Sequence, residues 1–513
     1  MAEIDGSVFD FIVVGAGSAG SVVAARLTEV SQWRVLLIEA GGDPPVEAIV
    51  PGYSPSLQRS QYDWNYYSYQ NQTGAAQKIP HVSPVAKGKV LGGSSSLNTM
   101  VYASTEGPII VTKPKGTDPD VIRKLDIVIE SLGEIGIKPL LDFNGPTQYG
   151  ISWTLFTHSK PPSVRSSTAV SYLVPNRYRK NLYVLKNAYV SKVLIDDHNG
   201  AYGIEVHVNK KIFSFFAKKE VIVSTGVINT PKLLVASGIG PKHDVERLGI
   251  PLVADLPVGV EMQNHYQVPV VVTGEHHENV SYNGDCPLDS PNHVTLMLNG
   301  FYSVFDHTRP EYQLIPYYLN QSSPIVRGIF SNNFFYNDQI VQSVLDLNAE
   351  HEIFLYNFLI LRPKSRGSVT IKGVGEEDDP IIRANAVYNP EDIFVLREGI
   401  KRIVNYITET KYYKHIGAKI FKMNLPQCDY FEFLSDDYWD CYCVNMLAME
   451  YNQCCSTGMG RVVDQELKVY GTRRLRVVDA SVMPSIPSGN LNIPTITIAE
   501  RASDLIKHEH LGK

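Results

Sequence analysis

The sequence has no apolar run long enough to cross a bilayer and no long block of charges of one sign. Its 47 basic and 53 acidic residues give a formal net charge of −6, which disfavours nucleic acid as a partner. The first residues, MAEIDGSVFDFIVV, include no basic segment that leads into an apolar stretch. We therefore expect a soluble protein as written. A secreted protein whose leader is absent from this chain and a cytoplasmic protein both fit this start.

The chain also lacks the paired cysteine spacing of zinc ribbons, although it contains six cysteines. Five lie late in the chain, and the set is Cys286, Cys428, Cys441, Cys443, Cys454 and Cys455. This arrangement allows disulfides without requiring them. We assign no metal site, and the sequence leaves the oligomeric state unknown. Because 513 residues exceed one ordinary core, we expect two intimately joined domains.

The stretch from Phe9 to Ala40 has the pattern of a strand, a phosphate-binding turn, a helix and a second strand. Phe9 to Val14 is an apolar, β-branched run that suits a buried parallel strand. In the following GAGSAG, Gly15 permits a tight turn, Gly17 lets the backbone approach a pyrophosphate, and Gly20 lets the helix lie close to the strand. The free N–H groups at that helix start favour a doubly negative ligand.

An acidic residue follows the second predicted strand, Arg34 to Ile38. Glu39 stands where a carboxylate can accept hydrogen bonds from both hydroxyls of an adenosine ribose and would repel a 2′-phosphate. The pattern favours FAD or NAD over NADP. A glycine triplet alone also closes ordinary turns, but the strand, the helix and the acid together predict a dinucleotide site.

Later segments extend this domain and add a second one. In GKVLGGSSSLN, at Gly88 to Asn98, glycines and small hydroxylated residues can crowd donors around phosphates, and a flexible loop is the competing interpretation. Val221 to Ser224 and Leu475 to Val478 are short apolar runs typical of further buried strands. Tracts such as YQVPVVVTG suit an antiparallel sheet that roofs a pocket. Glu391 to Thr410 has the pattern of an amphipathic helix.

These motifs resemble the glucose-methanol-choline family of flavin oxidoreductases, whose FAD signature is GKVLGGSSxxN. The resemblance covers almost the whole chain, in family order, through DWNYY, RSSTAVSYLVP, LYVLKNAYVSKVL, STGVINTPKLLVASGIGP, LPVGVEMQNH, LRPKSRGSVTI and LRVVDASVMPSIPSGNLNIPTITIAERASDLI. It implies an α/β fold of two domains in an α+β arrangement. Residues 1–242 with 446–513 would form a Rossmann-like FAD-binding domain, and residues 243–445 would form a substrate domain built on an antiparallel sheet.

The resemblance also implies a set of FAD contacts, with Val190 against the adenine and Asp479 near the pyrophosphate and ribitol. The predicted cofactor-binding residues are Gly15, Gly17, Ser18, Ala19, Gly20, Glu39, Ala40, Gly92, Gly93, Ser94, Asn98, Val101, Val190, Asp479, Ala480, Asn490 and Asn492. Covalently flavinylated relatives place a histidine at the position of Leu97. Leucine cannot make that bond, so the predicted FAD is non-covalent.

The predicted catalytic residues, Asn452 and Asn490, include one departure from the family. The family's catalytic histidine lies in a run like HPxGTxxMG, and YNQCCSTGMG here places Asn452 at that position. An amide cannot take a proton as imidazole does, and losing a positioned base typically costs on the order of 10²–10⁴ in rate. Other candidate bases are a thiolate at Cys454 or Cys455, and His265. For His265, a hydrogen-bonded role at the nucleotide is the commoner expectation.

The resemblance predicts oxidation of the CH–OH group of a small or lipophilic alcohol. The missing histidine leaves an alternative, an FAD-containing lyase or isomerase without redox turnover, or a degraded binding protein. A second departure is length, because family members usually carry on the order of fifty or more residues after the GGSSSxN segment. Here VYAS runs almost directly into EGPIIVTKP. We therefore expect a more exposed cofactor or a pocket open to a bulkier ligand. The sequence does not identify the substrate.

Overall fold

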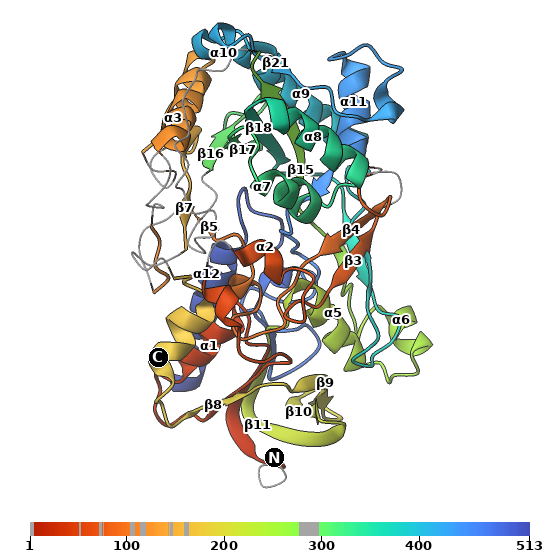
Figure 1. Cartoon of the computed structure of the whole chain (residues 1–513). Helices are drawn as coiled ribbons and strands as arrows, with labels where there is room; N and C mark the ends of the chain where they lie inside the picture. Colours follow the sequence, from red (N-terminus) through yellow and green to blue (C-terminus); the bar gives the residue numbers. More distant parts are fainter. Residues whose placement is uncertain are drawn as a thin grey trace.

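The computed structural model describes residues 5–50, 53–70, 74, 76–102, 108–112, 119–141, 143, 147–157, 164–275 and 297–512. Both chain termini lie at one end of the molecule, beside a mostly parallel sheet (Figure 1). An antiparallel sheet with its covering helices forms the opposite end (Figure 1). Segments from the start, the middle and the end of the chain meet between the two sheets.

The first sheet has the predicted Rossmann-like core. Its parallel part runs in the order β8, β2, β1, β11, and β23 also pairs with β11. Antiparallel β10 and β9 extend it from the first half of the long β11. The strands are β1 (Val8–Val14), β2 (Val35–Ile38), β8 (Leu182–Leu185), β9 (Tyr189–Ile195), β10 (Ala201–Val208), β11 (Lys211–Val223) and β23 (Leu475–Val477). The four strands expected in this domain are confirmed.

Helices cover the parallel strands. The helix α1 begins directly after the glycine turn, packs against the C-terminal helix α12, and buries all its residues except Arg26. Every residue of β2 is also buried, as expected for a parallel strand with both faces covered. The helices of this part are α1 (Gly20–Leu27), α2 (Ser54–Leu57), α4 (Val174–Asn176), α5 (Gly226–Ala236), α6 (Lys242–Arg247) and α12 (Asn492–Leu511).

The second sheet is antiparallel, as predicted, in the order β21, β15, β18, β17, β16, β6, with β22 beside β15. Every residue of β18 is buried, because helices pack on one face of the sheet and the other face turns toward the first domain. The strands are β6 (Gly150–Trp153), β15 (Tyr266–Thr273), β16 (Leu298–Tyr302), β17 (Tyr312–Leu319), β18 (Ile353–Ile360), β21 (Lys419–Ile420) and β22 (Ala448–Met449).

The helices of this part include the predicted amphipathic one, α9. It begins after Asn389, whose side chain accepts a hydrogen bond from the N–H of Glu391, and its buried residues recur at helical spacing from Leu396 to Ile407. The helix α3 packs on β17 and α9 packs on β18. The helices are α3 (Pro119–Glu134), α7 (Ile325–Arg327), α8 (Asp338–Glu350), α9 (Pro390–Ile407), α10 (Lys411–His415) and α11 (Asp436–Asn445).

A third, mixed sheet of five strands lies beside the first two: β14 (Val260–Met262), β19 (Gly367–Thr370), β20 (Ile381–Arg383), β3 (Tyr66–Tyr69) and β4 (Val82–Val85). Two short pairs complete the strands: β5 (Val101–Tyr102) with β7 (Leu155–Phe156), and β12 (Ile239–Gly240) with β13 (Ala254–Asp255). The predicted boundaries at 242/243 and 445/446 stay a prediction. The strand β6 lies before the first boundary, yet it pairs with β16 of the antiparallel sheet.

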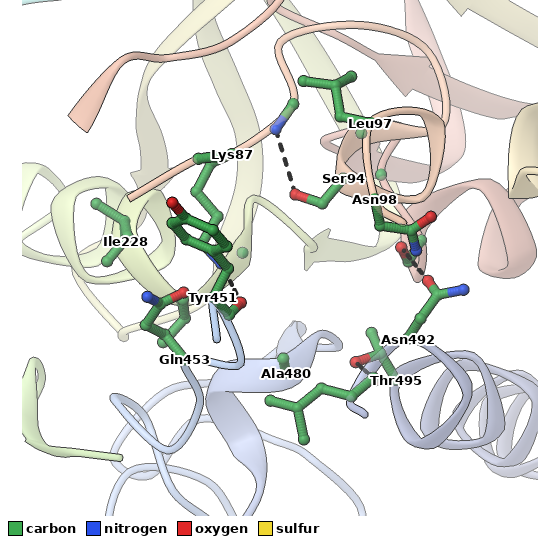
Figure 2. A pocket seen from close by; sticks show the side chains of 18 of the residues that line it. Lys87, Ser94, Leu97, Asn98, Ile228, Tyr451, Gln453, Ala480, Asn492 and Thr495 are labelled. Atoms are coloured by element: carbon green, nitrogen blue, oxygen red, sulfur yellow. Dashed lines mark hydrogen bonds between the residues drawn. The ribbon is translucent and has the colours of Figure 1, made fainter. Parts of the chain in front are cut away.

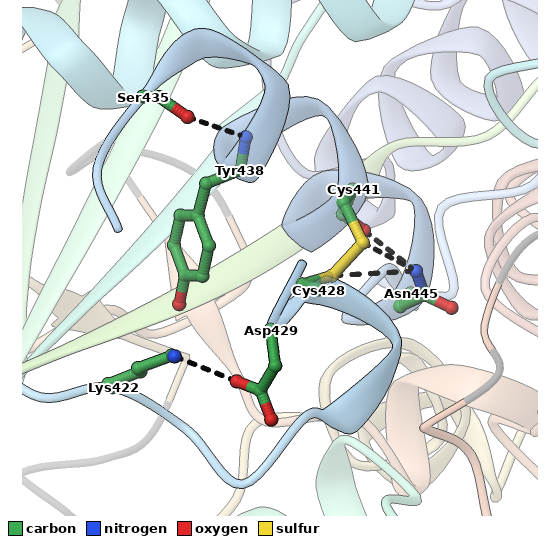
Figure 3. The surroundings of a disulfide bond; sticks show 7 residues. All are labelled: Lys422, Cys428, Asp429, Ser435, Tyr438, Cys441 and Asn445. Atoms are coloured by element: carbon green, nitrogen blue, oxygen red, sulfur yellow. Dashed lines mark hydrogen bonds and ion pairs between the residues drawn. A yellow bond between two sulfur atoms is a disulfide. The ribbon is translucent and has the colours of Figure 1, made fainter. Parts of the chain in front are cut away.

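One disulfide joins Cys428, at the end of a short 3₁₀ turn, to Cys441 on α11, with a Cα–Cα distance of 5.7 Å (Figure 3). Asn445 closes the same corner, because its Nδ2 donates to the carbonyl of Cys441 at 2.8 Å. Cys443, Cys454 and Cys455 are free and buried, and Cys286 lies outside the described residues. None of the helices in the described part of the chain combines the length and the apolar character needed to cross a bilayer.

Candidate active site

A cavity of about 380 Å³ runs from the first glycine turn to the antiparallel sheet. Most of the predicted site residues line it, although they come from segments far apart in the sequence. Those residues are Gly15, Gly17, Ser18, Ala19, Glu39, Ala40, Gly93, Ser94, Asn98, Val190, Asn452, Asp479, Ala480, Asn490 and Asn492. The structure thus brings both predicted catalytic asparagines and most of the predicted cofactor contacts to one cavity.

Two predicted residues, Gly20 and Gly92, do not line the cavity, and the side chain of a third lies outside the described part of the structure. Gly20 has a packing role, because a Cβ there would lie 1.8 Å from the carbonyl oxygen of Gly15. Gly92 adopts a left-handed conformation, with φ of 85°, and turns the chain into the GGSSS segment. Val101 contributes backbone to β5, and its side chain lies outside the described part of the structure.

The two glycine turns approach each other closely at the phosphate end. A Cβ on Gly93, whose φ is 52°, would lie 2.7 Å from the Cα of Gly17. A Cβ on Gly17 would meet nothing nearer than the Cα of Gly93, at 3.9 Å. Gly17 is therefore not required by the packing of the chain itself. The open space beside it is what a closely approaching pyrophosphate would use.

A buried arginine holds the second glycine turn, in the GGSSS segment, on the side away from the cavity. Arg165 donates to the carbonyl of Asn98 at 2.7 Å, to its side-chain oxygen at 2.8 Å, and to the carbonyl of Ala48 at 2.7 Å. Burial lowers the pKa of its guanidinium to about 9. Thr168 lies at the same place, since its Oγ1 contacts Ser95 Oγ at 3.0 Å. The segment RSSTAVSYLVP, expected to approach the substrate side, therefore begins by bracing the phosphate turn.

Glu39 stands at the end of β2, where the ribose of a dinucleotide was predicted. Its two oxygens accept hydrogen bonds from the backbone N–H groups of Ala16 and Gly41, both at 2.9 Å. Burial is the largest influence on its pKa and raises it to about 7, although the two N–H groups act in the opposite direction. Each carboxylate oxygen still has a lone pair for a ribose hydroxyl.

Asp479 and Asn492 join separate chain segments by hydrogen bonds beside the middle of the cavity. Asp479 accepts from the N–H of Gly226 at 2.9 Å and from Thr230 Oγ1 at 2.6 Å. Ser18 of the first glycine turn donates to Asn492 Oδ1 at 2.9 Å. Figure 2 shows Asn98 and Asn492 on one side of the cavity and Tyr451 on the other. These contacts connect the first turn, α5 and the C-terminal segment around one elongated space.

Asn452 lies in the deeper part of the cavity with a histidine behind it. Its Nδ2 lies 3.3 Å from His265 Nδ1, and its Oδ1 accepts from the N–H of Leu491 at 3.4 Å. His265 Nε2 lies 3.1 Å from the carbonyl of Leu361, which can only accept. These two contacts favour the tautomer that is protonated at Nε2, in which Nδ1 accepts from the amide of Asn452. Burial lowers the pKa of His265 to about 4.

The alternative bases that the sequence offered do not reach the cavity. His265 is fully buried, does not line the cavity, and lies behind Asn452. Cys454 and Cys455 face each other, with their Sγ atoms 2.8 Å apart, and neither lines the cavity. Burial is the main cause that raises the pKa of Cys454 well above its usual value. A thiolate at this position is disfavoured.

Several cavity residues were missed by the sequence motifs. Lys87 donates to the carbonyl of Tyr451 at 3.3 Å, and burial lowers the pKa of its ammonium to about 8. Gln453 and Glu450 line the same region. Lys87 directly precedes the GKVLGG motif and Glu450 lies two residues before Asn452, so proximity to a motif was the one signal available. The residue types alone gave no signal that these residues line the cavity.

The antiparallel sheet covers this end of the cavity with mostly apolar side chains. Met297, Ile315 and Tyr317 line it from the sheet, and Ile329 and Phe334 line it from the segment after α7. Gln267 adds an amide, which is tied to the carbonyl of Met449 at 3.0 Å. The chain thus offers polar groups near Asn452 and an apolar wall opposite them.

Comparison with known proteins fits this geometry. Two family models, both described as GMC oxidoreductase, match residues 105–267 and 363–499. Ecdysone oxidase of Bombyx mori is 33% identical over an alignment that covers 99% of this chain and 83% of that enzyme. The chain belongs to the GMC oxidoreductase family. Glucose dehydrogenase [FAD, quinone] of Drosophila melanogaster is 30% identical and is aligned over 97% of this chain and 87% of its own length.

A solved structure agrees in fold. A variant of formate oxidase from Aspergillus oryzae superposes with a TM-score of 0.82, at 22% identity, over 99% of each chain. The predicted GMC fold and the predicted class, an FAD-dependent oxidoreductase acting on CH–OH groups, are therefore confirmed. The non-redox alternative receives no support from these relatives. The alignment with the Bombyx enzyme spans 570 positions, so that GMC protein contains segments this chain lacks.

The residues present fit a bound FAD. The glycine cradle leaves room for a diphosphate, Glu39 has acceptor capacity for a ribose, and Leu97 lines the cavity with a side chain that offers no atom for a covalent bond. The individual roles of these residues in this GMC protein stay predictions, as does the correspondence of Asn452 to the family's histidine.

Proposed function

We propose that this protein binds FAD without a covalent bond and oxidises the CH–OH group of an uncharged alcohol with an apolar body. The observation that carries the proposal is one continuous cavity, which joins the glycine turns to Asn452 and Asn490 and ends under an apolar roof. When bound, FAD supplies the acceptor for the hydride that leaves the alcohol carbon. The chain itself supplies binding, orientation and exclusion of water.

Asn452 is suited to orient a hydroxyl. Its contacts with His265 and Leu491 use one of its two N–H groups and one of the two lone pairs on its oxygen. One donor and one acceptor position remain, which is what a hydroxyl group needs. Asn490 lines the same end of the cavity and can hold the hydroxyl from a second direction. Neither amide takes the proton.

The roof supports a lipophilic substrate. Met297, Ile315 and Phe334 offer an apolar wall without a charge. The name of the Bombyx relative, ecdysone oxidase, also supports an alcohol with a large apolar body. Fewer residues after the GGSSS segment would leave the entrance wide enough for such a body, although residues 103–107 and 113–118 lie outside the described part of the chain.

The decisive experiment is anaerobic mixing of the FAD-loaded protein with a panel of neutral alcohols graded by size. We expect loss of oxidised-flavin absorbance with apolar alcohols and recovery of one equivalent of carbonyl product. Choline and other permanently charged alcohols should reduce the flavin more slowly. If no alcohol bleaches the flavin at any pH, the proposed function is wrong.

The proposal that FAD is held without a covalent bond is tested separately. Acid precipitation of the flavin-loaded protein should release all FAD into the supernatant, because Leu97 cannot form the covalent link. Yellow colour retained in the pellet would contradict the proposed non-covalent binding and would have no bearing on the proposed reaction.

Asn452→His tests the position of the asparagine. An imidazole at this point would add a base to the reacting end, and we expect flavin reduction to accelerate by about tenfold or more. Equal rates in the variant and the parent would mean that Asn452 does not face the reacting carbon.

A further inference from the structure

A carboxylate lies at the reacting end of the cavity, outside every motif. Glu450 directly follows β22 and precedes Asn452 by two residues, and both residues line the cavity. Glu450 is half-buried and lies among the residues that line the cavity. Among the described residues, no hydrogen bond or neighbouring charge acts on its carboxylate, and burial alone raises its pKa, to about 8.

The backbone holds Glu450 firmly although its side chain has no partner there. Its N–H donates to the carbonyl of His265 at 3.2 Å, and the preceding Met449 pairs with Tyr266 of β15. The next residue, Tyr451, has a φ of 58° and turns the chain toward Asn452. Beyond Asn452, the backbones of Cys454 and Gln263 exchange two hydrogen bonds. The segment from Glu450 to Asn452 is therefore anchored at both ends, and Glu450 and Asn452 both line the cavity.

We propose that Glu450 is the proton acceptor of the alcohol oxidation, in place of the imidazole that position 452 lacks. This rests on the proposed function. In the step, the O–H bond of the substrate breaks and its proton goes to the Glu450 carboxylate. The hydrogen of the C–H bond leaves with the bonding electron pair as hydride, for which a bound FAD would supply the acceptor, and the carbon–oxygen double bond forms. Asn452 orients the hydroxyl, and His265 positions Asn452.

The other titratable groups around the site are less suited to this role. His265 accepts from Asn452 through its one basic nitrogen and is shielded from the cavity. Lys87 donates to the carbonyl of Tyr451, and although burial lowers its pKa to about 8, the nearby Asp63 favours its charged form. Tyr317 and Tyr451 are neutral, because burial and the nearby Glu450 both raise their pKa values. Glu450 is the one cavity-lining carboxylate at this end in the described part of the chain.

A half-buried carboxyl with a raised pKa is matched to this task. A base must be ionised to take a proton and must be basic enough to hold it, and burial supplies the second property. The rate of flavin reduction should therefore rise with pH until Glu450 is ionised and level off above a midpoint of about 8.

The test is anaerobic flavin reduction by one neutral alcohol, followed against pH in FAD-loaded wild type, Glu450→Gln, Glu450→Asp and Lys87→Arg. We expect Glu450→Gln to lower the limiting rate by about 10²–10⁴ and to remove the rising limb. Glu450→Asp should keep the limb at a lower rate. Lys87 titrates in the same range, and Lys87→Arg, which stays charged, should also keep it. The matched control is Glu377→Gln, the same change at an exposed residue outside the cavity.

A second readout needs no turnover. The infrared difference between wild type and Glu450→Gln should show a carboxylic-acid band that disappears as pH rises through about 8. If Glu450→Gln loses FAD, Glu450→Asp and the wild-type pH profile still decide the matter. A wild-type rate independent of pH across this range would overturn the proposal.

Three outcomes separate the possibilities. If no alcohol reduces the wild-type flavin, the proposed function fails. If the wild type is reduced and Glu450→Gln is reduced equally fast with the same pH profile, Glu450 is not the acceptor. If Glu450→Gln raises KM for cationic alcohols alone and leaves the limiting rate for neutral alcohols unchanged, Glu450 recognises substrate charge, which also overturns the proposal.

Discussion

The two ends of the cavity are built in different ways. At the adenosine and phosphate end, one local segment supplies β1, the glycine turn, α1 and Glu39, and a second glycine turn closes on it. At the reacting end, the contributions come from β15, from the segment directly after β22 and from the chain before α12. The first end follows the family pattern. The second holds the amide of Asn452, which is predicted to stand in place of the family's histidine, and the half-buried carboxyl of Glu450. We therefore expect that variants can affect cofactor binding and proton transfer separately in this protein.

The largest effect is expected from a variant that blocks the phosphate end of the cavity and leaves the reacting end unchanged. A Cβ on Gly17 would meet nothing nearer than the Cα of Gly93, at 3.9 Å, so we expect Gly17→Val to fold while its side chain occupies the space that a diphosphate would use. We expect complete loss of bound flavin, measured by absorbance after gel filtration. The matched control is Gly133→Ala on α3, whose Cβ would also meet its nearest atom at 3.9 Å and lies outside the cavity. Flavin retained by Gly17→Val would place the diphosphate elsewhere.

Glu39→Gln should weaken the same end less severely. Losing a charged acceptor for two ribose hydroxyls is expected to raise the Kd for FAD by about tenfold to a hundredfold, measured by fluorescence titration. In wild type the affinity should fall as pH drops below about 7, because the neutral carboxyl loses acceptor capacity. The variant should show no such dependence. Its rate of flavin reduction at saturating FAD should remain that of wild type.

The raised pKa of Glu39 also makes the stability of the protein depend on pH. Folding raises the pKa of Glu39 from 4.5 to about 7, so the folded protein without cofactor binds the proton more tightly than the unfolded chain. Stability therefore falls as pH rises through this window. Glu39→Gln removes this loss, so urea unfolding of the cofactor-free variant should depend less on pH than that of wild type. Parallel curves for the two proteins would show that Glu39 is ionised when folded.

His265→Gln should act on the reacting end through Asn452. We expect the rate of flavin reduction to fall by about tenfold while FAD affinity is unchanged, since His265 does not line the cavity. Burial lowers the His265 pKa from 6.5 to about 4, so wild type should lose stability as pH falls through that window and the variant should lose less. Urea unfolding along this range measures the difference. An unchanged reduction rate would mean that Asn452 needs no positioning by the ring.

The smallest effect on either end is expected from the disulfide. Cys428 and Cys441 are separated by 13 residues, and the Cys428→Ser, Cys441→Ser double variant should lose about 3 kcal/mol of stability. Neither cysteine lines the cavity, so FAD content and reduction rate should match wild type below the melting temperature. A change in either would show that the α11 corner in Figure 3 communicates with the cavity.

Much of the fold follows from local patterns. The strand run before Gly15, the helix after it and the amphipathic spacing of α9 are each visible within a short window, because burial on one or both faces leaves a periodic signature. The segment 266–273 was also readable as a strand. The joining of β6 to the antiparallel sheet was not, because a four-residue strand carries too little pattern to indicate its partner.

The sequence by itself determined the family, the glycine turns and the absence of an imidazole at position 452, since all three are properties of residue types in a fixed order. Only the tertiary structure decided that His265 stands behind Asn452, that Arg165 braces a turn some seventy residues before it, and that Glu450 faces the cavity. The physical reason is that burial and hydrogen-bond partners arise from contacts between distant segments. Those contacts set which of several ordinary side chains can move a proton.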